Sequence, residues 1–202
     1  IPHGGRMRLG YLCVGLVLAV GFYSISASRI KAQALELNAR QRLDQVVQLG
    51  IHRSGNGDLL NEVIELYQAA ILLDPDNADA WIGLSAARCQ LFYRNPANYE
   101  QIGMRASNFA QRAIELTETY WMAWAQLGIA EGLVGNEIEA EAALTRALEL
   151  APNNGNAHYY WAAYLSHFSE RRVEAIASVQ RALEISPNHA AARKLQQKLR
   201  IL

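Results

Sequence analysis

The chain has 202 residues, of which 51% are hydrophobic, so it can form one soluble domain plus a short additional segment. Nineteen basic and nineteen acidic residues cancel to a net charge of zero, which excludes the basic surface that nucleic-acid binding needs. Cys13 and Cys89 lie far apart, so neither a disulfide framework nor a metal cluster is predicted. Ala, Leu and Glu dominate from residue 30 onward and favour an all-α fold.

The N-terminal part of the chain contains one long uncharged run, residues 9–28. About 20 apolar residues is the length of a helix that crosses a bilayer. The run continues without a break into helix-forming sequence, so we expect a transmembrane helix or signal anchor. Residues 1–8 do not begin with Met and are interpreted as a flank or a cloning remnant.

A secretory signal peptide is the alternative interpretation of the same run. It would begin at Met7, followed by Arg8, an apolar stretch and the small residues Ser24, Ser26 and Ala27. The alternatives differ in topology, because a signal peptide would place the rest of the chain outside the cytoplasm. The positive-inside rule instead favours a cytoplasmic location for the rest of the chain, since more basic residues follow the run than precede it. We expect a single-pass protein of a bacterial inner membrane, with the side of its main domain left open.

After the apolar run, residues 29–52 have apolar side chains spaced mostly by three or four, which predicts a helix. Residues 54–57 (SGNG) end it, and a second helix is predicted over 58–73. Together they indicate a first, imperfect helix hairpin.

Residues 121–154 carry the clearest pattern of the chain. Small residues stand where two antiparallel helices must approach closely, large ones fill the seam, Gly135 and Asn136 supply the turn, and Pro152 ends the second helix. The residues that carry this pattern are Trp124, Leu127, Gly128, Ala140, Leu144, Ala147 and Pro152. One departure from the repeat named next is Glu131, which stands where that repeat has Tyr. This segment resembles the tetratricopeptide repeat (TPR), a unit of about 34 residues.

The resemblance extends to neighbouring segments. Val63, Tyr67, Ala70 and Pro75 match the later places, and Trp81 opens the next unit. In the last unit the matching residues are Tyr159, Ala162, Ala163, Ala175, Val179, Ala182 and Pro187. The predicted TPR domain, 29–202, therefore holds about three to four repeats at 44–77, 78–120, 121–154 and 156–189, with a capping helix at 190–202. The resemblance implies hairpins stacked into a right-handed superhelix.

The unit at 78–120 is longer than the others because of an insertion that centres on residues 92–101. Either its helices are longer and its loop wider, or the insertion is a protruding contact loop, since insertions in repeat arrays map to loops on one face.

Motifs for catalysis are not found. The five His residues lack metal-ligand spacing, Gly55 and Gly57 do not form a phosphate-binding loop, and there is no G-x-S-x-G elbow. We therefore predict a protein that is not an enzyme and has neither cofactor nor metal.

In TPR proteins, residues at fixed positions on the first helix of each repeat contact the ligand. The resemblance therefore implies a binding groove. Lys, Arg and Asn, which would grip the acidic C-termini of chaperones, are absent there, so a protein or peptide partner of another kind is expected. Alternatively, the aromatic residues pack against the C-terminal helix. The predicted groove residues are Met122, Ala125, Ile129, Leu133, Tyr160, Tyr164, His167 and Phe168.

Three functions remain open. The first is a scaffold, anchored in the membrane through residues 9–28, for protein–protein interaction in envelope or membrane assembly. The second is the C-terminal TPR tail of a polytopic membrane enzyme that resembles an O-antigen ligase or polymerase. The third is a secreted periplasmic assembly factor whose first 27 residues are removed.

Overall fold

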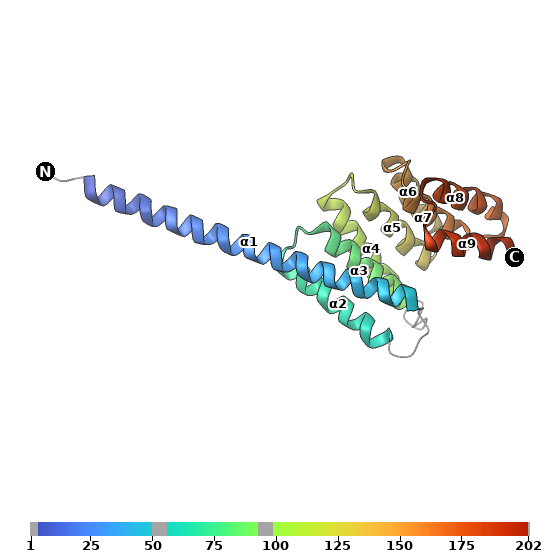
Figure 1. Ribbon diagram of the computed structural model, residues 1–202, viewed down its shortest axis with the longest axis horizontal. Coiled ribbons are helices and arrows are strands. Elements are labelled where there is room, and N and C mark those ends of the chain that lie inside the picture. Colours follow the sequence, from blue (N-terminus) through green and yellow to red (C-terminus); the bar gives the residue numbers. More distant parts are fainter. Residues whose placement is uncertain (1–3, 50–55, 93–98, 202) are drawn as a thin grey trace.

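A computed structural model describes the backbone of residues 4–49, 56–92 and 99–201, and the side chains of 21, 23–48, 57–92 and 100–200. The described residues form nine α-helices and the short 3-10 helix η2, and they contain no strand (Figure 1). The helices are α1 (Gly4–Leu49), α2 (Asn56–Leu73), α3 (Ala78–Phe92), α4 (Tyr99–Leu116), α5 (Trp121–Val134), α6 (Glu137–Leu150), α7 (Gly155–Leu165), η2 (Ser169–Arg171), α8 (Arg172–Ile185) and α9 (Ala190–Ile201). The predicted all-α class is confirmed.

Successive helices pack as hairpins: α1 with α2, α3 with α4, α5 with α6 and α7 with α8. The hairpins stack side by side, and α9 packs against α8 at the end of the row (Figure 1). The first helix of each hairpin also contacts the first helix of the next. These first helices therefore form one continuous face, and the predicted stack of hairpins is confirmed.

The C-terminal part of α1 is the first helix of the opening hairpin. Ala39 and Leu43 of α1 are buried in one cluster with Leu60, Val63 and Tyr67 of α2. The N-terminal part of the same helix projects away from the stack (Figure 1). Because α1 is one helix, the projecting part is coupled to the hairpins through continuous helical backbone.

The predicted membrane span, 9–28, lies mostly in the projecting part of α1. Residues 9–20 and 22 of this span lie outside the described side chains. Among the described residues, no helix combines the length and apolar character that crossing a membrane requires. The span stays a prediction.

The long unit at 78–120 has a helix of 18 residues, α4, where the next hairpin has two helices of 14 residues each. Longer helices thus account for part of the predicted insertion. Residues 93–98, which would form the predicted contact loop, lie outside the described residues.

The same hydrogen bond recurs wherever one described hairpin passes to the next. A side chain in the first turn of the new helix bonds to the backbone carbonyl six residues earlier: Trp81 Nε1 to Pro75 at 2.8 Å, Trp124 Nε1 to Glu118 at 2.7 Å and His158 Nε2 to Pro152 at 2.9 Å. His158, rather than Tyr159, therefore takes the Trp place in the last hairpin. The predicted alignment of the first helix of that hairpin is wrong by one residue.

The junction before α9 contains a histidine that makes stability depend on pH. His189 Nδ1 accepts a hydrogen bond from the Ala192 amide at 3.3 Å, and its buried Nε2 has no partner. Burial lowers the pKa of His189, and burial followed by the charge of Lys198 lowers that of His167. Both side chains thus bind protons less readily in the folded chain than in the unfolded chain.

We expect stability to be highest above the ordinary histidine pKa of about 6.5 and to fall as pH drops below it, because protons then favour the unfolded chain. Replacing His189 with Asn keeps a helix-capping acceptor and should flatten this pH dependence. Thermal melts followed by circular dichroism between pH 5 and 8 measure the effect. An unchanged slope in the variant would contradict this role for His189.

Candidate binding groove

The first helices of the last three described hairpins enclose a cavity of about 500 Å³ on their shared face. We call it the aromatic pocket. Its lining is mostly apolar and comes from α3, α5, α7, the first residue of α6 and the residues that follow α7. It comprises Cys89, Gln90, Phe92, Ile129, Gly132, Leu133, Glu137, Tyr159, Tyr160, Ala163, Tyr164, His167 and Phe168.

Most of the predicted groove residues meet in this pocket: Ile129, Leu133, Tyr160, Tyr164, His167 and Phe168 line it. Met122 and Ala125 do not. Met122 packs beside Ile82 and Ala113, and Ala125 is buried in the core cluster of the last hairpins.

On α7, the predicted groove residues omit two that line the pocket, Tyr159 and Ala163. The cause is the same one-residue error in the last hairpin. Counted from Gly155, where α7 begins, the fifth, ninth and thirteenth places are Tyr159, Ala163 and His167. The start of α7 could have been found from Asn154, whose side chain accepts hydrogen bonds from the amides of the first turn.

The pocket wall is fixed by ring packing along α7. The Tyr164 ring lies edge-on to Phe168 at 5.1 Å between centroids, and its hydroxyl donates to the Glu137 carbonyl at 3.4 Å. Gly132 leaves room for this ring, because a Cβ there would lie 3.2 Å from it. Tyr160 contacts the ring of Tyr159 at 5.6 Å between centroids. Contacts within the chain thus hold the wall in place.

The aromatic residues also pack toward the C-terminal helix. Tyr159, Tyr160 and Phe168 lie against the core cluster that includes Ala192 and Leu199 of α9. Their side chains therefore pack against the core that includes the capping helix and also line the pocket.

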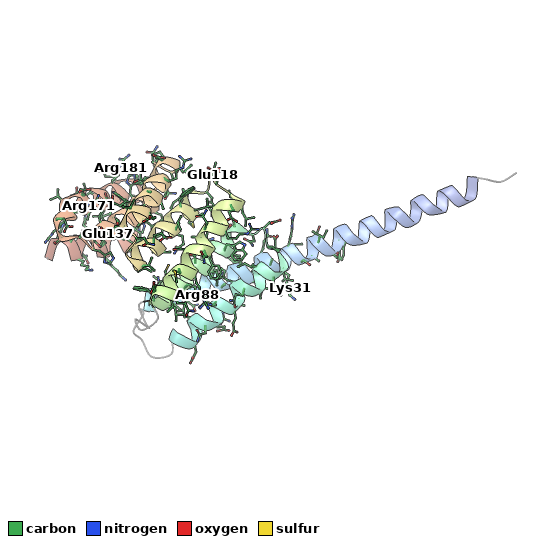
Figure 2. All side chains as sticks on the ribbon, turned by 180° about the vertical axis from the view of Figure 1, so that it is seen from behind. Lys31, Arg88, Glu118, Glu137, Arg171 and Arg181 are labelled. Atoms are coloured by element: carbon green, nitrogen blue, oxygen red, sulfur yellow. The ribbon has the colours of Figure 1, made fainter. Side chains whose placement is uncertain are left out.

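Arg171 connects the helices next to the aromatic pocket through ion pairs and a ring contact. It pairs with Glu141 of α6 and with Glu174 of α8, and its guanidinium lies 5.5 Å from the Trp161 ring centroid. Figure 2 shows Arg171 and Glu137 at the same end of the molecule. These contacts hold α6, α7 and α8 together behind the pocket.

The pocket is poor in reactive groups. Burial raises the pKa of the Cys89 thiol to about 12, and this outweighs the hydrogen bond that Gln126 Nε2 donates to Sγ at 3.2 Å. The thiol is therefore neutral at physiological pH. The pKa of His167 is lowered, so its ring is neutral as well. Within the described residues, no group of three His, Cys, Asp or Glu side chains could hold a metal ion.

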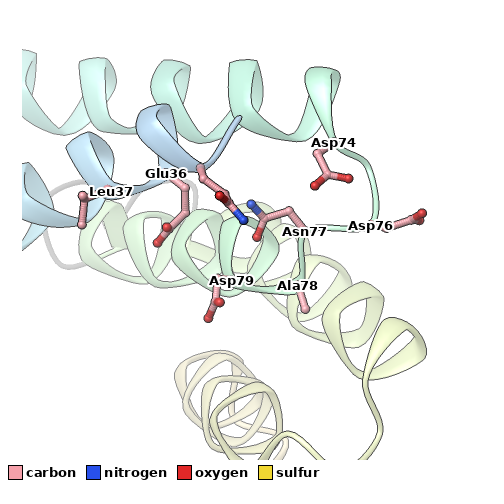
Figure 3. A pocket seen from close by; sticks show the side chains of 8 residues that line it. Glu36, Leu37, Asp74, Asp76, Asn77, Ala78 and Asp79 are labelled. Carbon is pink, nitrogen blue, oxygen red and sulfur yellow. The ribbon is translucent and has the colours of Figure 1, made fainter. Parts of the chain in front are cut away.

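A second hollow, which we call the acidic pocket, lies between α1 and the turn from α2 to α3 (Figure 3). Glu36, Asp74, Asp76 and Asp79 are among its lining residues. Burial, and after it the charge of Asp79, raises the pKa of Glu36. This pocket is not predicted from the sequence.

Comparison with known proteins supports the repeat architecture. The family model "Tetratricopeptide repeat" matches residues 123–154. No curated protein sequence matches this chain significantly. Together with the stacked hairpins, the match identifies residues 123–154 as a tetratricopeptide repeat within an all-α stack of helix hairpins.

Several solved structures align with this chain, and one of those described here shares its fold. The crystal structure of TTC0263, a thermophilic TPR protein in Thermus thermophilus, aligns with a TM-score of 0.70 at 21% identity, over 96% of this chain and 97% of that one. YrrB, described as a TPR protein with an unusual peptide-binding site, has 20% identity, a TM-score of 0.41 and coverage of 77% and 88%. MamA from Desulfovibrio magneticus RS-1 has 12% identity, a TM-score of 0.49 and coverage of 83% and 84%. At this identity, the likeness to TTC0263 establishes the fold alone.

Proposed function

We propose that this chain is a membrane-anchored TPR scaffold that holds a segment of another protein in the groove formed by its first helices. The aromatic pocket carries the proposal. It is lined mainly by apolar and aromatic side chains and is open on the face shared by α3, α5 and α7. Such surfaces suit protein contacts, where aromatic residues contribute most of the binding energy.

Chemistry in the pocket is not favoured. The Cys89 thiol is protonated and the His167 ring is neutral. The thiol is therefore not in its nucleophilic thiolate form, and the imidazole carries no positive charge that would stabilise an anion. A binding role fits these groups better than catalysis.

Membrane anchoring through residues 9–28 is the second part of the proposal. The uncharged run supports it, because its length matches a helix that crosses a bilayer. The continuity of α1 would hold the hairpins in a fixed orientation relative to the bilayer. Anchored protein should resist extraction with alkaline carbonate and dissolve in detergent.

The intact mass of the native protein separates the three functions that the sequence leaves open. A chain from Met7 that keeps its apolar run supports the anchored scaffold. A chain lacking its first 27 residues would indicate a secreted factor, and a much larger mass would indicate the tail of a polytopic protein.

A matched pair of variants tests the groove. Ala163 lines the aromatic pocket, whereas Ala177 is exposed on the outer helix α8, and both are helical alanines. Replacing Ala163 with Glu places a charged chain in the pocket, and we expect partner recovery to fall at least about tenfold, because a charge buried without a partner opposes binding. The Ala177→Glu variant should recover partners like the unaltered chain.

Quantitative mass spectrometry of affinity-purified complexes measures both variants, and circular dichroism confirms that each is folded. Equal partner recovery by the two folded variants would refute the groove as the binding surface.

A further inference from the structure

We infer that the partner segment is both basic and apolar, with Lys or Arg side chains in the acidic pocket and a large apolar side chain in the aromatic pocket. This inference rests on the proposed function, and it adds the chemistry of the ligand to it.

The acidic pocket has an excess of negative charge. Four carboxylates line it, those of Glu36, Asp74, Asp76 and Asp79. Among the described residues, the recorded cations that act on them are Arg29, 3.9 Å from Asp74, and Arg40, whose charge lowers the pKa of Glu36. The larger effects on Glu36 are burial and the negative charge of Asp79, both of which raise its pKa. A cation supplied by a partner would relieve this repulsion.

The two pockets belong to one face of the stack. Asp79 of the acidic pocket accepts a hydrogen bond from the Tyr120 hydroxyl at 2.6 Å, where the chain enters α5. Tyr160 of the aromatic pocket lies within the electrostatic reach of Asp44 and Arg40 on α1. The carboxylates of α1 and α3 and the aromatic wall of α7 thus belong to the same row of first helices, in which α1 contacts α3, α3 contacts α5 and α5 contacts α7.

The spacing along α3 sets the length of the ligand. Asp79 of the acidic pocket lies in the first turn of this helix and Cys89 of the aromatic pocket in its last turn, so at 1.5 Å per residue these two residues are about 15 Å apart along the helix axis. An extended chain advances about 3.3 Å per residue. A basic residue and an apolar anchor separated by about five residues would therefore reach both pockets.

Charge complementarity favours another protein as the occupant. An acidic segment would be repelled by the carboxylates. The chain's own basic helix, α9, is not available, because Ala192 and Leu199 are buried in the core of the last hairpins. The partner is therefore a protein with an accessible basic and apolar segment.

The first test uses a phage-displayed library of random 12-residue peptides, selected on the full chain in lipid nanodiscs. We expect the selected peptides to carry Lys or Arg about five residues from an aromatic or large aliphatic residue. Peptides with apolar residues but no basic preference would overturn this inference and leave the proposed function standing. Recovery of no peptide would overturn both. Peptides that resemble residues 190–201 of this chain would indicate a second copy and overturn the assignment to another protein.

Charge-neutralising variants then test the selected peptide directly. The double variant Glu36→Gln and Asp76→Asn should weaken its binding about tenfold at low salt, since it removes two of the four carboxylates. The control, Glu149→Gln and Glu184→Gln, removes the same charge from exposed positions on α6 and α8 that line neither pocket, and it should bind unchanged. Fluorescence anisotropy between about 50 and 500 mM salt measures the affinities, and the unaltered chain should lose affinity as screening increases. Equal affinities for the two double variants would overturn the role of the acidic pocket.

Discussion

Replacing Tyr67 with alanine is expected to lower the free energy of unfolding by about 4 kcal/mol, a cost typical of deleting a buried aromatic ring. The side chain is 2% exposed and belongs to the cluster that joins α1, α2 and α3. Gly83 of α3 faces it so closely that a Cβ there would lie 2.2 Å from the ring. A cavity in this place would weaken both the opening hairpin and its contact with the next.

Phenylalanine at position 67 is the matched control. It keeps the ring and removes the hydroxyl, and we expect a loss of less than about 1.5 kcal/mol. Urea unfolding followed by circular dichroism measures both variants. If alanine cost no more than phenylalanine, the opening hairpin would not unfold together with the rest of the stack.

Replacing Gly128 with valine should cost about 3 kcal/mol, because α5 and α6 meet at this glycine without space for a side chain. A Cβ there would lie 2.5 Å from Leu144 Cγ and 2.9 Å from the Ala140 carbonyl oxygen. The carbonyl is backbone, so the clash can be relieved only by moving the helices apart. The hairpin with the clearest repeat pattern would then lose its internal packing.

Valine at position 139 controls for the lower helix propensity of a β-branched residue. Glu139 is exposed on α6, so its replacement should cost no more than about 1 kcal/mol. The same urea titration compares the two. Similar losses at both positions would show that the close approach at Gly128 does not limit stability.

The hairpin at 121–154 could be predicted from the sequence because its pattern reflects local geometry. Gly128 stands where two helices touch, and Gly135, with φ of 88°, ends α5 in the left-handed conformation that glycine adopts easily. Such requirements limit the residue types that each position can hold, so they are visible in the sequence. The confirmed stacking of the hairpins has the same origin.

The last hairpin shows where pattern matching fails. Its second helix is aligned correctly on Ala175, Val179 and Ala182, which are fully buried in the structure. The predicted alignment of the first helix is wrong by one residue, because the turn that contains η2 is longer than the turn of the preceding hairpin. The adjacent tyrosines at 159 and 160 fit either alignment. Tyr159 and Ala163 are missed for that reason alone.

The acidic pocket could not be predicted in full, because its carboxylates come from separate elements. Asp74, Asp76 and Asp79 are close in sequence and could have been noted as a group. Glu36 joins them only through the packing of α1 beside α3, which no local pattern records. The predicted domain bounds, the membrane span and the binding role of the groove residues stay predictions.

Site-specific photo-crosslinking in intact cells tests the binding groove most directly. A photoreactive phenylalanine analogue would replace His167, which is exposed and lines the aromatic pocket, or Ile138, which is 82% exposed on the outer helix α6. The proposed function predicts a discrete crosslinked protein from position 167 and none from position 138. Crosslinking from position 138 alone would contradict it and move the binding surface to the outside of the stack.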